Sequence, residues 1–523
     1  MKRRTGALVG TLRGDSSGTS SPLHRQVYSR IRASILDGVF APGARLPSSR
    51  TLASDLGMSR ITVESAFSQL TAEGYLVRRI GAGSYVADVL PALVGRTRRP
   101  LASTSSAPSE SVKRRVHGTG ALSLRGQAIS HSSLDAEPVG VRPFQPCMPA
   151  LDVFPNATWA RLVSRRARHS PELLAYGEQA GYRPLREAVA AYLSTSRGVR
   201  CAWEQVIILS GAQQGIDLAA RVLLDAGDQV WHEEPGYLGA RGAFIAAGAR
   251  IVPVPVDADG LDVDAGVAAA PRARLAYVTP SHQFPLGHTM SLSRRLALLA
   301  WAERANAWIV EDDYDSEFRY VGRPIAATQG LDTSGRVIYV GTFNKVMFPS
   351  LRLAYLVVPP DLVNGFVAAR ALGDGHPPVL AQAAMTDFIE HGHFGAHVRQ
   401  MRALYHERRD ALLDALHSQL SDAMRLGPVD AGMHLVMRHP AIRDDLAVVE
   451  AADVAGLAVD RLSRHYMGQR HQRGLLLGFT ALPAEHTRRA VRTLAPLLGS
   501  QNARGTRRLE RAEDAAAGGR DGA

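Results

Sequence analysis

The sequence predicts an α/β protein in two parts, a small N-terminal domain of helices with a hairpin and a large C-terminal domain built on a mostly parallel sheet. From Arg142 onward strand-like and helix-like runs alternate, which is typical of a sheet sandwiched by helices. Three helical patterns and two short strand patterns occupy residues 20–87. A stretch rich in Ser, Pro, Arg and Gly separates the two parts and indicates a linker.

Length and composition exclude several classes of protein. The chain has 523 residues, of which 46% are hydrophobic, so it can bury large cores. Its two cysteines, Cys147 and Cys201, cannot build a disulfide framework and suit a reducing compartment. The basic N-terminus lacks the apolar core of a signal peptide, and no run of about 18 apolar residues follows. We therefore expect a soluble cytoplasmic protein that does not enter a membrane.

The positive charge is concentrated at the N-terminus. Residues 1–120 hold 18 Lys and Arg against 7 Asp and Glu, a net charge of +11 out of the +12 of the whole chain. A basic segment on a nearly neutral body indicates a polyanionic partner for that segment alone. The alternative is a solvated basic surface without a partner.

The N-terminal patterns are those of a helix-turn-helix followed by a wing. Apolar residues recur at helical spacing in residues 22–36, a short second helix stops at Gly57, and Ser59 caps a third helix. The segment YLVRRIGAGSYVA then predicts two short strands around a glycine turn. In this geometry the start of the third helix enters the major groove, and the preceding helix and the wing lie against the DNA backbone. The predicted contacts are Arg50, Ser59, Arg60, Thr62, Arg78 and Arg79. A plain helical bundle is the alternative.

The segment PGARLPSSRTLASDLGMSRITVESAFSQLTAEGYLVRRIGAGSYV resembles the winged helix-turn-helix of the GntR superfamily, over roughly Pro22 to Ala87. This resemblance implies double-stranded DNA as a partner, with contacts from Arg50, Arg60 and Thr62 and with Gly81 at the wing. We expect no base contact from Glu64, which stands where family members can carry arginine.

The predicted domain boundaries follow from these patterns. Residues 20–87 form the DNA-binding domain, residues 88–141 a flexible linker, residues 142–498 the large domain and residues 499–523 a disordered tail.

The large domain is organised around a lysine between two strand patterns. The β-branched run Val337–Val340 breaks at Gly341, and Lys345 precedes a second strand pattern. A lysine in a loop at the end of a buried strand can lose its proton and attack a carbonyl, because partial burial disfavours the ammonium form. Thr342 and Arg352 could converge on an anion beside it. Taken alone, the pattern also fits an ordinary surface lysine.

Other strand ends carry the remaining parts of a cofactor site. Ser210, Gly211, Ala212 and Gln213 lie between a strand and a helix, where backbone N–H groups favour a phosphate. Tyr237 follows a second strand and could stack on a planar ligand. A third strand runs into EDDY, where a carboxylate could pair with a ring nitrogen and a phenol with a ring oxygen. Together with a lysine these groups predict pyridoxal 5'-phosphate as the cofactor. Structural roles for each residue are the alternative.

The order of these groups resembles the fold-type-I aminotransferases from about Phe144 to Leu498. The resemblance implies that Lys345 carries the cofactor as an internal aldimine and is the catalytic residue, that Asp312 pairs with the pyridine nitrogen, and that Tyr314 approaches the 3'-oxygen. It implies stacking by Tyr237 and a phosphate site around Ser210, Gly211, Ala212, Gln213, Thr342 and Arg352. Tyr176 would reach the neighbouring subunit's phosphate, which implies a homodimer, and Arg473 would grip a substrate carboxylate.

The two halves together match the MocR-type regulators, on TPSHQFPLG, EDDYDSEFRY and the threonine-containing GTF before the lysine. Two positions depart from that family. Asn344 replaces serine before the lysine, where it can still hydrogen-bond beside the cofactor, and Ala354 replaces glycine after the arginine.

We therefore interpret the chain as a transcription regulator, a head-to-tail homodimer that senses a small amino compound through aldimine exchange at Lys345. A working aminotransferase with an accessory DNA-binding domain is the second hypothesis, and a regulator that senses the cofactor itself is the third.

Overall fold

The structure is a computed structural model that describes residues 22–79, 82–88, 122–131, 140–322, 325–420, 422–468 and 471–498. These residues belong to two compact units, one within residues 1–116 and the other within residues 117–523. Among the helices of the described ranges, none is both long and apolar enough to cross a bilayer.

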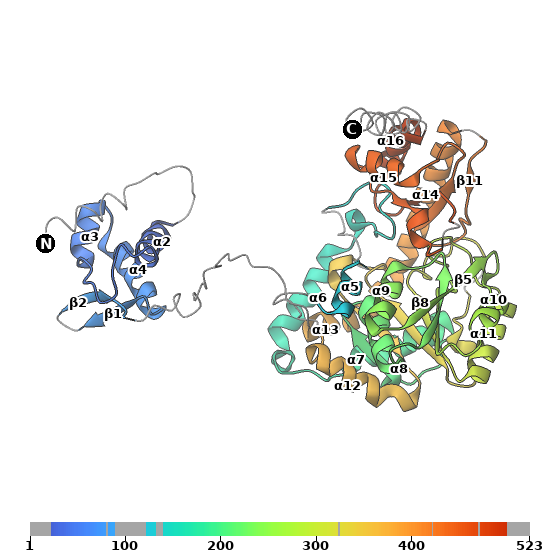
Figure 1. The fold of residues 1–523 in the computed structure, drawn as a ribbon, viewed down its shortest axis with the longest axis horizontal. Helices are drawn as coiled ribbons and strands as arrows, with labels where there is room; N and C mark the ends of the chain where they lie inside the picture. The colour runs from blue at the N-terminus through green and yellow to red at the C-terminus, as the bar shows by residue number, and fades with distance from the viewer. Residues whose placement is uncertain are drawn as a thin grey trace, which may run out of the picture. The chain divides into compact units, whose positions relative to one another are not determined.

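In its described residues the N-terminal unit has three helices and a two-stranded wing, as the sequence predicts (Figure 1). Gly57 ends the second helix in the left-handed region with φ +66°, and the Ser59 hydroxyl accepts the N–H of Thr62 at 3.2 Å to cap the third helix. Ile31 and Phe67 lie in its buried core. The elements are α2 (Leu23–Leu36), α3 (Ser49–Leu56), α4 (Arg60–Ala72), β1 (Leu76–Arg79) and the antiparallel β2 (Gly83–Val86).

The large unit contains an eight-stranded sheet in the order β3-β10-β9-β8-β7-β4-β5-β6. The five strands from β9 to β5 are parallel, whereas β10 runs antiparallel to both β9 and β3, and β6 is antiparallel to β5. Their bounds are β3 (Val206–Leu209), β4 (Gln229–Glu234), β5 (Arg250–Asp257), β6 (Gly260–Leu261), β7 (Leu275–Val278), β8 (Trp308–Asp313), β9 (Val337–Thr342) and β10 (Ala354–Val357).

Helices cover both faces of this sheet, because its strands are apolar on both sides. Ile207 and Leu209 of β3 point into a core with α8, α9 and α12, whereas Val206 and Ile208 point into the opposite core with α7 and α13. The helices are α6 (Asn156–His169), α7 (Arg183–Arg197), α8 (Ala212–Leu223), α9 (Leu238–Ala247), α10 (Val263–Ala269), α11 (Leu292–Ala305), α12 (Val363–Asp374), α13 (Val379–Glu390), α14 (His393–Gln419), α15 (Asp445–Val454) and α16 (Ala484–Leu494).

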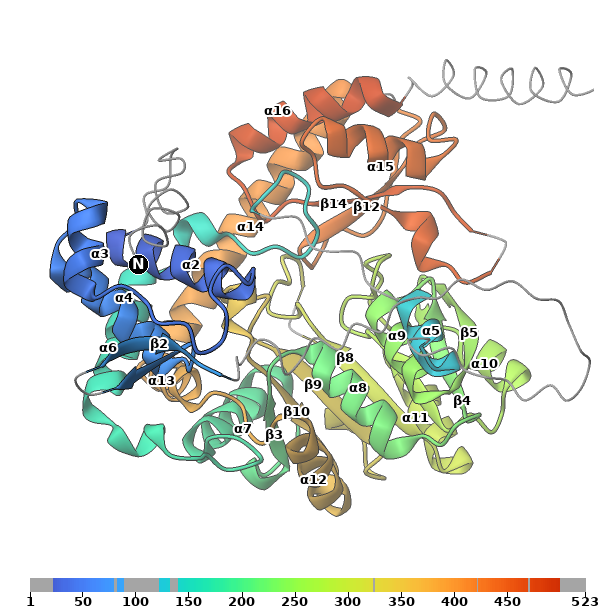
Figure 2. The ribbon, with the colours of Figure 1, turned by 60° about the vertical axis from the view of Figure 1, so that its left-hand side comes forward.

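A second, smaller lobe carries a four-stranded antiparallel sheet in the order β11-β12-β14-β13. Figure 2 shows α14, α15 and α16 gathered around this sheet, apart from the large one. Its strands are β11 (Arg425–Leu426), β12 (His434–Arg438), β13 (Asp460–Arg461) and β14 (Leu475–Gly478).

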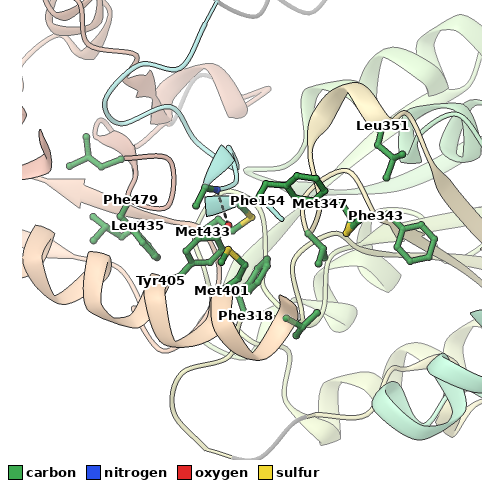
Figure 3. Close-up of a cluster of buried hydrophobic side chains, with 14 of the residues drawn as sticks. Phe154, Phe318, Phe343, Met347, Leu351, Met401, Tyr405, Met433, Leu435 and Phe479 are labelled. Carbon is green, nitrogen blue, oxygen red and sulfur yellow. Dashed lines mark hydrogen bonds between the residues drawn. The ribbon is translucent and has the colours of Figure 1, made fainter. Parts of the chain in front are cut away.

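One continuous apolar core joins the small lobe to the segment that carries the lysine. Phe343 and Met347, which flank Lys345, belong to the same buried cluster as Met401 and Tyr405 of α14 and Leu435 of β12 (Figure 3). The Tyr405 hydroxyl also accepts the N–H of Ala150 at 3.0 Å. The lysine loop is therefore held from both sides by buried contacts.

The sequence did not predict helix α5 (Leu124–His131), which lies inside the range expected to be a flexible linker. It contacts α9 of the large unit. The rest of the predicted linker is largely outside the described residues, as is the predicted tail, and the domain boundaries themselves remain predictions.

Candidate functional site

The start of α4 exposes the residues expected to meet DNA. Arg50 and Arg60 are exposed and Thr62 is half-buried, while the Ser59 hydroxyl lies 2.9 Å from that of Thr62 and caps the helix. Ile61, between the two polar positions, is 82% exposed. The sequence predicts only polar contacts at this helix start, and Ile61 is not among them. An exposed apolar residue at the start of a helix after a tight turn is the signal that could have identified it.

One wing arginine is held against a helix and the other against the second wing strand. Arg78 pairs with Glu64 of α4 at 2.7 Å, and the Arg79 guanidinium lies 4.8 Å from the centre of the Tyr85 ring. Hydrogen bonds with Ser49 and Arg78 keep the pKa of Glu64 below its usual value, so this carboxylate connects α3, α4 and the wing. Gly81 lies outside the described residues.

In the large unit, strand register brings the predicted phosphate residues to one sheet edge. Ala354 of β10 lies opposite both Leu209, at the end of β3, and Thr342, at the end of β9. The loops after these strands therefore meet, with Ser210–Gln213 on one side and Arg352 on the other. A Cβ built on Gly211 would lie 2.9 Å from a terminal nitrogen of Arg352. The guanidinium thus lies directly over the backbone at the start of α8, an arrangement suited to an anion.

Arg352 adopts a backbone conformation that costs free energy. Its φ of +52° is in the left-handed region, which side chains with a Cβ rarely adopt outside functional sites. The Asn344 side-chain oxygen accepts the N–H of Leu353 at 2.9 Å, and the Asn344 N–H lies 3.2 Å from the Thr342 hydroxyl. Asn344 therefore holds the loop that carries Arg352, a role the sequence did not identify.

Lys345 is half-buried beside this cradle and is the only lysine after residue 113. The chain has three lysines, Lys2, Lys113 and Lys345, among its 61 basic residues. All other Lys or Arg positions of the large domain carry arginine. Lys345 alone carries a primary amine. Arginine cannot replace that amine in attack on a carbonyl, because its guanidinium stays protonated.

Asp312 supplies the buried carboxylate near the lysine. It is at the end of β8, and its Oδ2 accepts the Tyr277 hydroxyl at 2.7 Å. Burial raises its pKa from 3.8 to about 7, against a lowering by Lys345 among others. Its Oδ1 is buried and has no hydrogen-bond partner among the described residues. A protonated ring nitrogen would satisfy that oxygen, so the carboxylate fits the predicted pyridine partner.

Tyr237 and Tyr314 lie beyond the carboxyl ends of β4 and β8, which are separated in the sheet by β7. Tyr237 precedes α9, and its ring lies with the Gln213 side chain over Gly239, where a Cβ would come within 2.5 Å of both. Tyr314 is buried, and its hydroxyl lies 2.9 Å from Nδ1 of His282. His282, just after β7, belongs to the segment TPSHQFPLG and is not among the predicted site residues. Its position after a predicted strand, like that of the other predicted site residues, is the sequence feature that could have identified it.

Two predicted residues lie apart from this cluster. Arg473 is exposed and donates a hydrogen bond to the carbonyl of Arg443, and no described contact joins it to the site. Tyr176 is 98% exposed, with only its ring edge near His376, and does not contact the site of its own chain.

The raised pKa of Asp312 gives a test without cofactor. Between about pH 4 and pH 7 the folded protein keeps a proton that the unfolded chain has released, so stability falls as pH rises through this range. Asp312→Asn removes this contribution. We expect the loss of unfolding free energy between about pH 5 and pH 8, measured by urea denaturation of the cofactor-free protein, to be smaller in the variant than in the wild type. Equal losses would contradict the assignment.

Comparison with known proteins assigns both units. Residues 23–86 match the family model of the bacterial regulatory proteins, gntR family. Residues 151–469 match the family model of aminotransferase class I and II. The probable rhizopine catabolism regulatory protein MocR of Rhizobium meliloti is 42% identical over 95% of this chain and 98% of its own. The pyridoxine biosynthesis regulator PdxR of Corynebacterium glutamicum is 30% identical over 87% and 91%.

Solved aminotransferases share the fold of the large unit. The α-aminoadipate aminotransferase LysN from Thermus thermophilus, complexed with N-(5'-phosphopyridoxyl)-L-leucine, is 30% identical, with a TM-score of 0.65 over 70% of this chain and 94% of its own. The buried Asp312 oxygen and the Gly211–Arg352 cradle fit the same cofactor, pyridoxal 5'-phosphate, which supplies an electron sink when bound. The predicted fold and cofactor are therefore confirmed. The chain belongs to the MocR-type family of transcription regulators, in which a DNA-binding GntR helix-turn-helix precedes a pyridoxal-phosphate-type aminotransferase domain.

Proposed function

We propose that this regulator acts in the cytoplasm and changes its affinity for DNA when a small amino compound reacts at the cofactor held by Lys345. The observation that carries the proposal is the single lysine of the large domain, whose charge acts on the buried Asp312 carboxylate and whose loop also carries Arg352, in a chain that also has a helix-turn-helix. For the reaction to regulate, the amine must bind two arrangements of the protein with unequal affinity.

Each group has a role in this proposal. Asp312 pairs with the ring nitrogen, Tyr237 covers the ring and Tyr314 donates to the 3'-oxygen. Ser210, Gly211, Ala212, Gln213 and Thr342 surround the phosphate with Arg352, while Asn344 holds the loop. Lys345 would hold the cofactor through its amine, and the bound cofactor would supply imine exchange with the free amine of the effector, which would leave the side chain of Lys345 free. The carboxylate grip by Arg473 stays a prediction, and its exposed position requires the segment to move.

DNA reading and dimerisation belong to the same proposal. Arg60 and Thr62 meet the major groove, and the exposed Ile61 is suited to the methyl group of thymine. Leu174, Tyr176 and Leu372, which are 88%, 98% and 85% accessible, are large side chains open to contact with a second copy. A head-to-tail homodimer would cover them and bring Tyr176 to the neighbouring phosphate site.

The test measures DNA affinity and turnover on the same preparation. We expect full-length protein to bind a fragment from upstream of its own gene, and an effective amine to change that affinity by at least about fivefold when the cofactor is present. Fluorescence anisotropy with a panel of amines and amino acids provides the measurement. Affinity that stays constant under all these conditions contradicts the proposal.

Two other functions give different results. The intact lysine, carboxylate and arginine favour a working aminotransferase as the second candidate, which predicts steady transamination at rates of about 1 per second or more. The relative PdxR is named as a regulator of pyridoxine biosynthesis. This favours a third candidate, in which the cofactor itself is the signal. That candidate predicts a change in DNA affinity when pyridoxal phosphate is added without any amine.

A further inference from the structure

Three buried residues beside the cofactor site form a hydrogen-bonded chain, of which the proposed function uses only Tyr314. Nδ1 of His282 lies 3.0 Å from Oδ2 of Asp315 and 2.9 Å from the hydroxyl of Tyr314. His282 follows β7, and the other two residues directly follow β8. His282 is 2% exposed, Asp315 1% and Tyr314 9%, so water does not substitute for these contacts.

The hydrogen on Nδ1 decides which way the Tyr314 hydroxyl points. An ionised Asp315 only accepts hydrogen bonds, so the contact with Oδ2 requires that Nδ1 carries its hydrogen. The Tyr314 oxygen, at a similar distance from the same Nδ1, is then also an acceptor from that N–H. The hydroxyl hydrogen of Tyr314 is therefore free to point away from His282.

Without the Asp315 carboxylate, the proton of His282 could move to the other ring nitrogen, Nε2. Nε2 of His282 is buried and has no hydrogen-bond partner among the described residues. The bond with Asp315 favours the proton on Nδ1, and no acceptor among the described residues competes for it at Nε2. If the proton moved to Nε2, the lone pair of Nδ1 would accept the Tyr314 hydrogen, and the hydroxyl would turn toward His282.

We propose that His282 and Asp315 are positioning residues that aim the Tyr314 hydroxyl at the 3'-oxygen of the cofactor. Asp315 fixes the tautomer of His282, and His282 in turn fixes the hydroxyl of Tyr314. This inference rests on the proposed function, since it needs the cofactor beside Tyr314. It adds a control on the proton balance of the chromophore, because a donor to the 3'-oxygen stabilises its anionic form.

The groups around this chain are also defined. Asp312, Tyr277 and Cys147 interact electrostatically with Tyr314, in addition to Asp315, and burial is the main cause that raises the Tyr314 pKa. Nε2 of His434 lies 3.1 Å from the carbonyl of Pro285 and its Nδ1 lies 3.7 Å from the Cys147 sulfur. A ring nitrogen of His434, a ring nitrogen of His282 and a carboxylate oxygen of Asp315 all lie within 4.8 Å of one another. None of these neighbours is substituted in the variants below, but Asp315→Asn also removes a charge that raises the pKa of Asp312. A shift caused by that charge alone would persist in the Tyr314→Phe background.

The experiment follows the visible absorbance of the cofactor-loaded full-length protein as pH is varied. In Asp315→Asn an amide can donate to Nδ1 and favour the proton on Nε2. The Tyr314 hydrogen then leaves the 3'-oxygen. We expect the midpoint of the spectral titration to rise by about one pH unit, a tenfold change in the proton equilibrium. Tyr314→Phe should raise it at least as far, and Asp315→Asn should add no further shift in the Tyr314→Phe background.

Controls separate the possible failures. Asp257→Asn, which breaks an ion pair with Arg294 at a half-exposed carboxylate, should leave the midpoint unchanged. A colourless wild-type protein in excess pyridoxal phosphate overturns the proposed function. A coloured wild type with an unshifted Asp315→Asn midpoint, or with additive shifts in the double variant, overturns this inference alone.

A second measurement avoids dependence on the folding of any variant. In wild-type protein labelled with nitrogen-15 at histidine, the chemical shifts of the two ring nitrogens report which one is protonated. We expect the His282 proton on Nδ1 in the cofactor-loaded protein. A proton on Nε2 alone would overturn the inference.

Discussion

Lys345→Ala should yield a protein that loses its colour completely on gel filtration in buffer without pyridoxal phosphate, while the wild type stays coloured. The variant removes the only primary amine of the large unit that could hold the cofactor covalently. Asp312 and Arg352 remain, so the cofactor can still bind without a covalent link and then dissociates. The visible spectrum before and after filtration provides the measurement.

The low lysine content makes this experiment unusually clear. Reduction of the loaded protein with borohydride should attach the cofactor to one peptide, which mass spectrometry would identify by its Lys345. Lys113→Arg is the matched control, since Lys113 lies in the predicted linker, and it should keep both the colour and the labelled peptide. A label on Lys2 or Lys113, or colour retained by Lys345→Ala after filtration, would contradict the role of Lys345.

The same variant separates sensing from DNA binding. We expect Lys345→Ala to bind operator DNA through an intact N-terminal unit but to lose the response to amines, because the exchange reaction has no lysine to displace. Loss of both properties would indicate that the lysine supports folding instead.

Arg197→Met should destabilise the large unit by about 3–5 kcal/mol. Nε of Arg197 lies 2.8 Å from Oδ2 of Asp313, and the two side chains are 5% and 1% exposed. The remaining guanidinium nitrogens donate to the carbonyl of Ile325 at 2.9 Å and to the Ser281 hydroxyl at 2.7 Å. Methionine fills a similar volume but leaves the Asp313 carboxylate buried without its cation, which is the main source of the cost.

Tryptophan fluorescence during urea denaturation is a suitable measurement. All five tryptophans lie after residue 141, so the signal reports the large unit alone. Arg221→Met is a matched control, because it breaks an exposed pair with Asp217 at 3.7 Å, with side chains 47% and 43% accessible, and should cost at most about 0.5 kcal/mol. Equal effects of the two substitutions would show that the Arg197 pair contributes no more than a surface pair.

The Arg197–Asp313 ion pair could not be predicted from the sequence. Arg197 ends α7 and Asp313 ends β8, 116 residues later, and no local pattern connects them. In the printed sequence Asp312 and Asp313 are equivalent neighbours. Alternation along the strand sends one toward Tyr277 and the other toward Arg197 and Tyr339. The choice of Asp312 as the ring partner came from a family resemblance and not from the residues themselves.

The sequence by itself determined those features that depend on local physics. Helix spacing, the serine caps and Gly57 fixed the helix-turn-helix, and the alternation of apolar runs fixed a parallel sheet with polar groups at its strand ends. The lone lysine of the large unit and the basic N-terminus were likewise readable from the chain.

Only the tertiary structure decided which strand ends meet and how their side chains bond. Strand order is set by packing between distant segments, so the approach of Arg352 to Gly211, the loop-holding role of Asn344 and the docking of α5 against α9 could not be read locally. The Asp315–His282–Tyr314 chain is of the same kind, because hydrogen bonds between loops depend on distances of about 3 Å that sequence spacing does not encode.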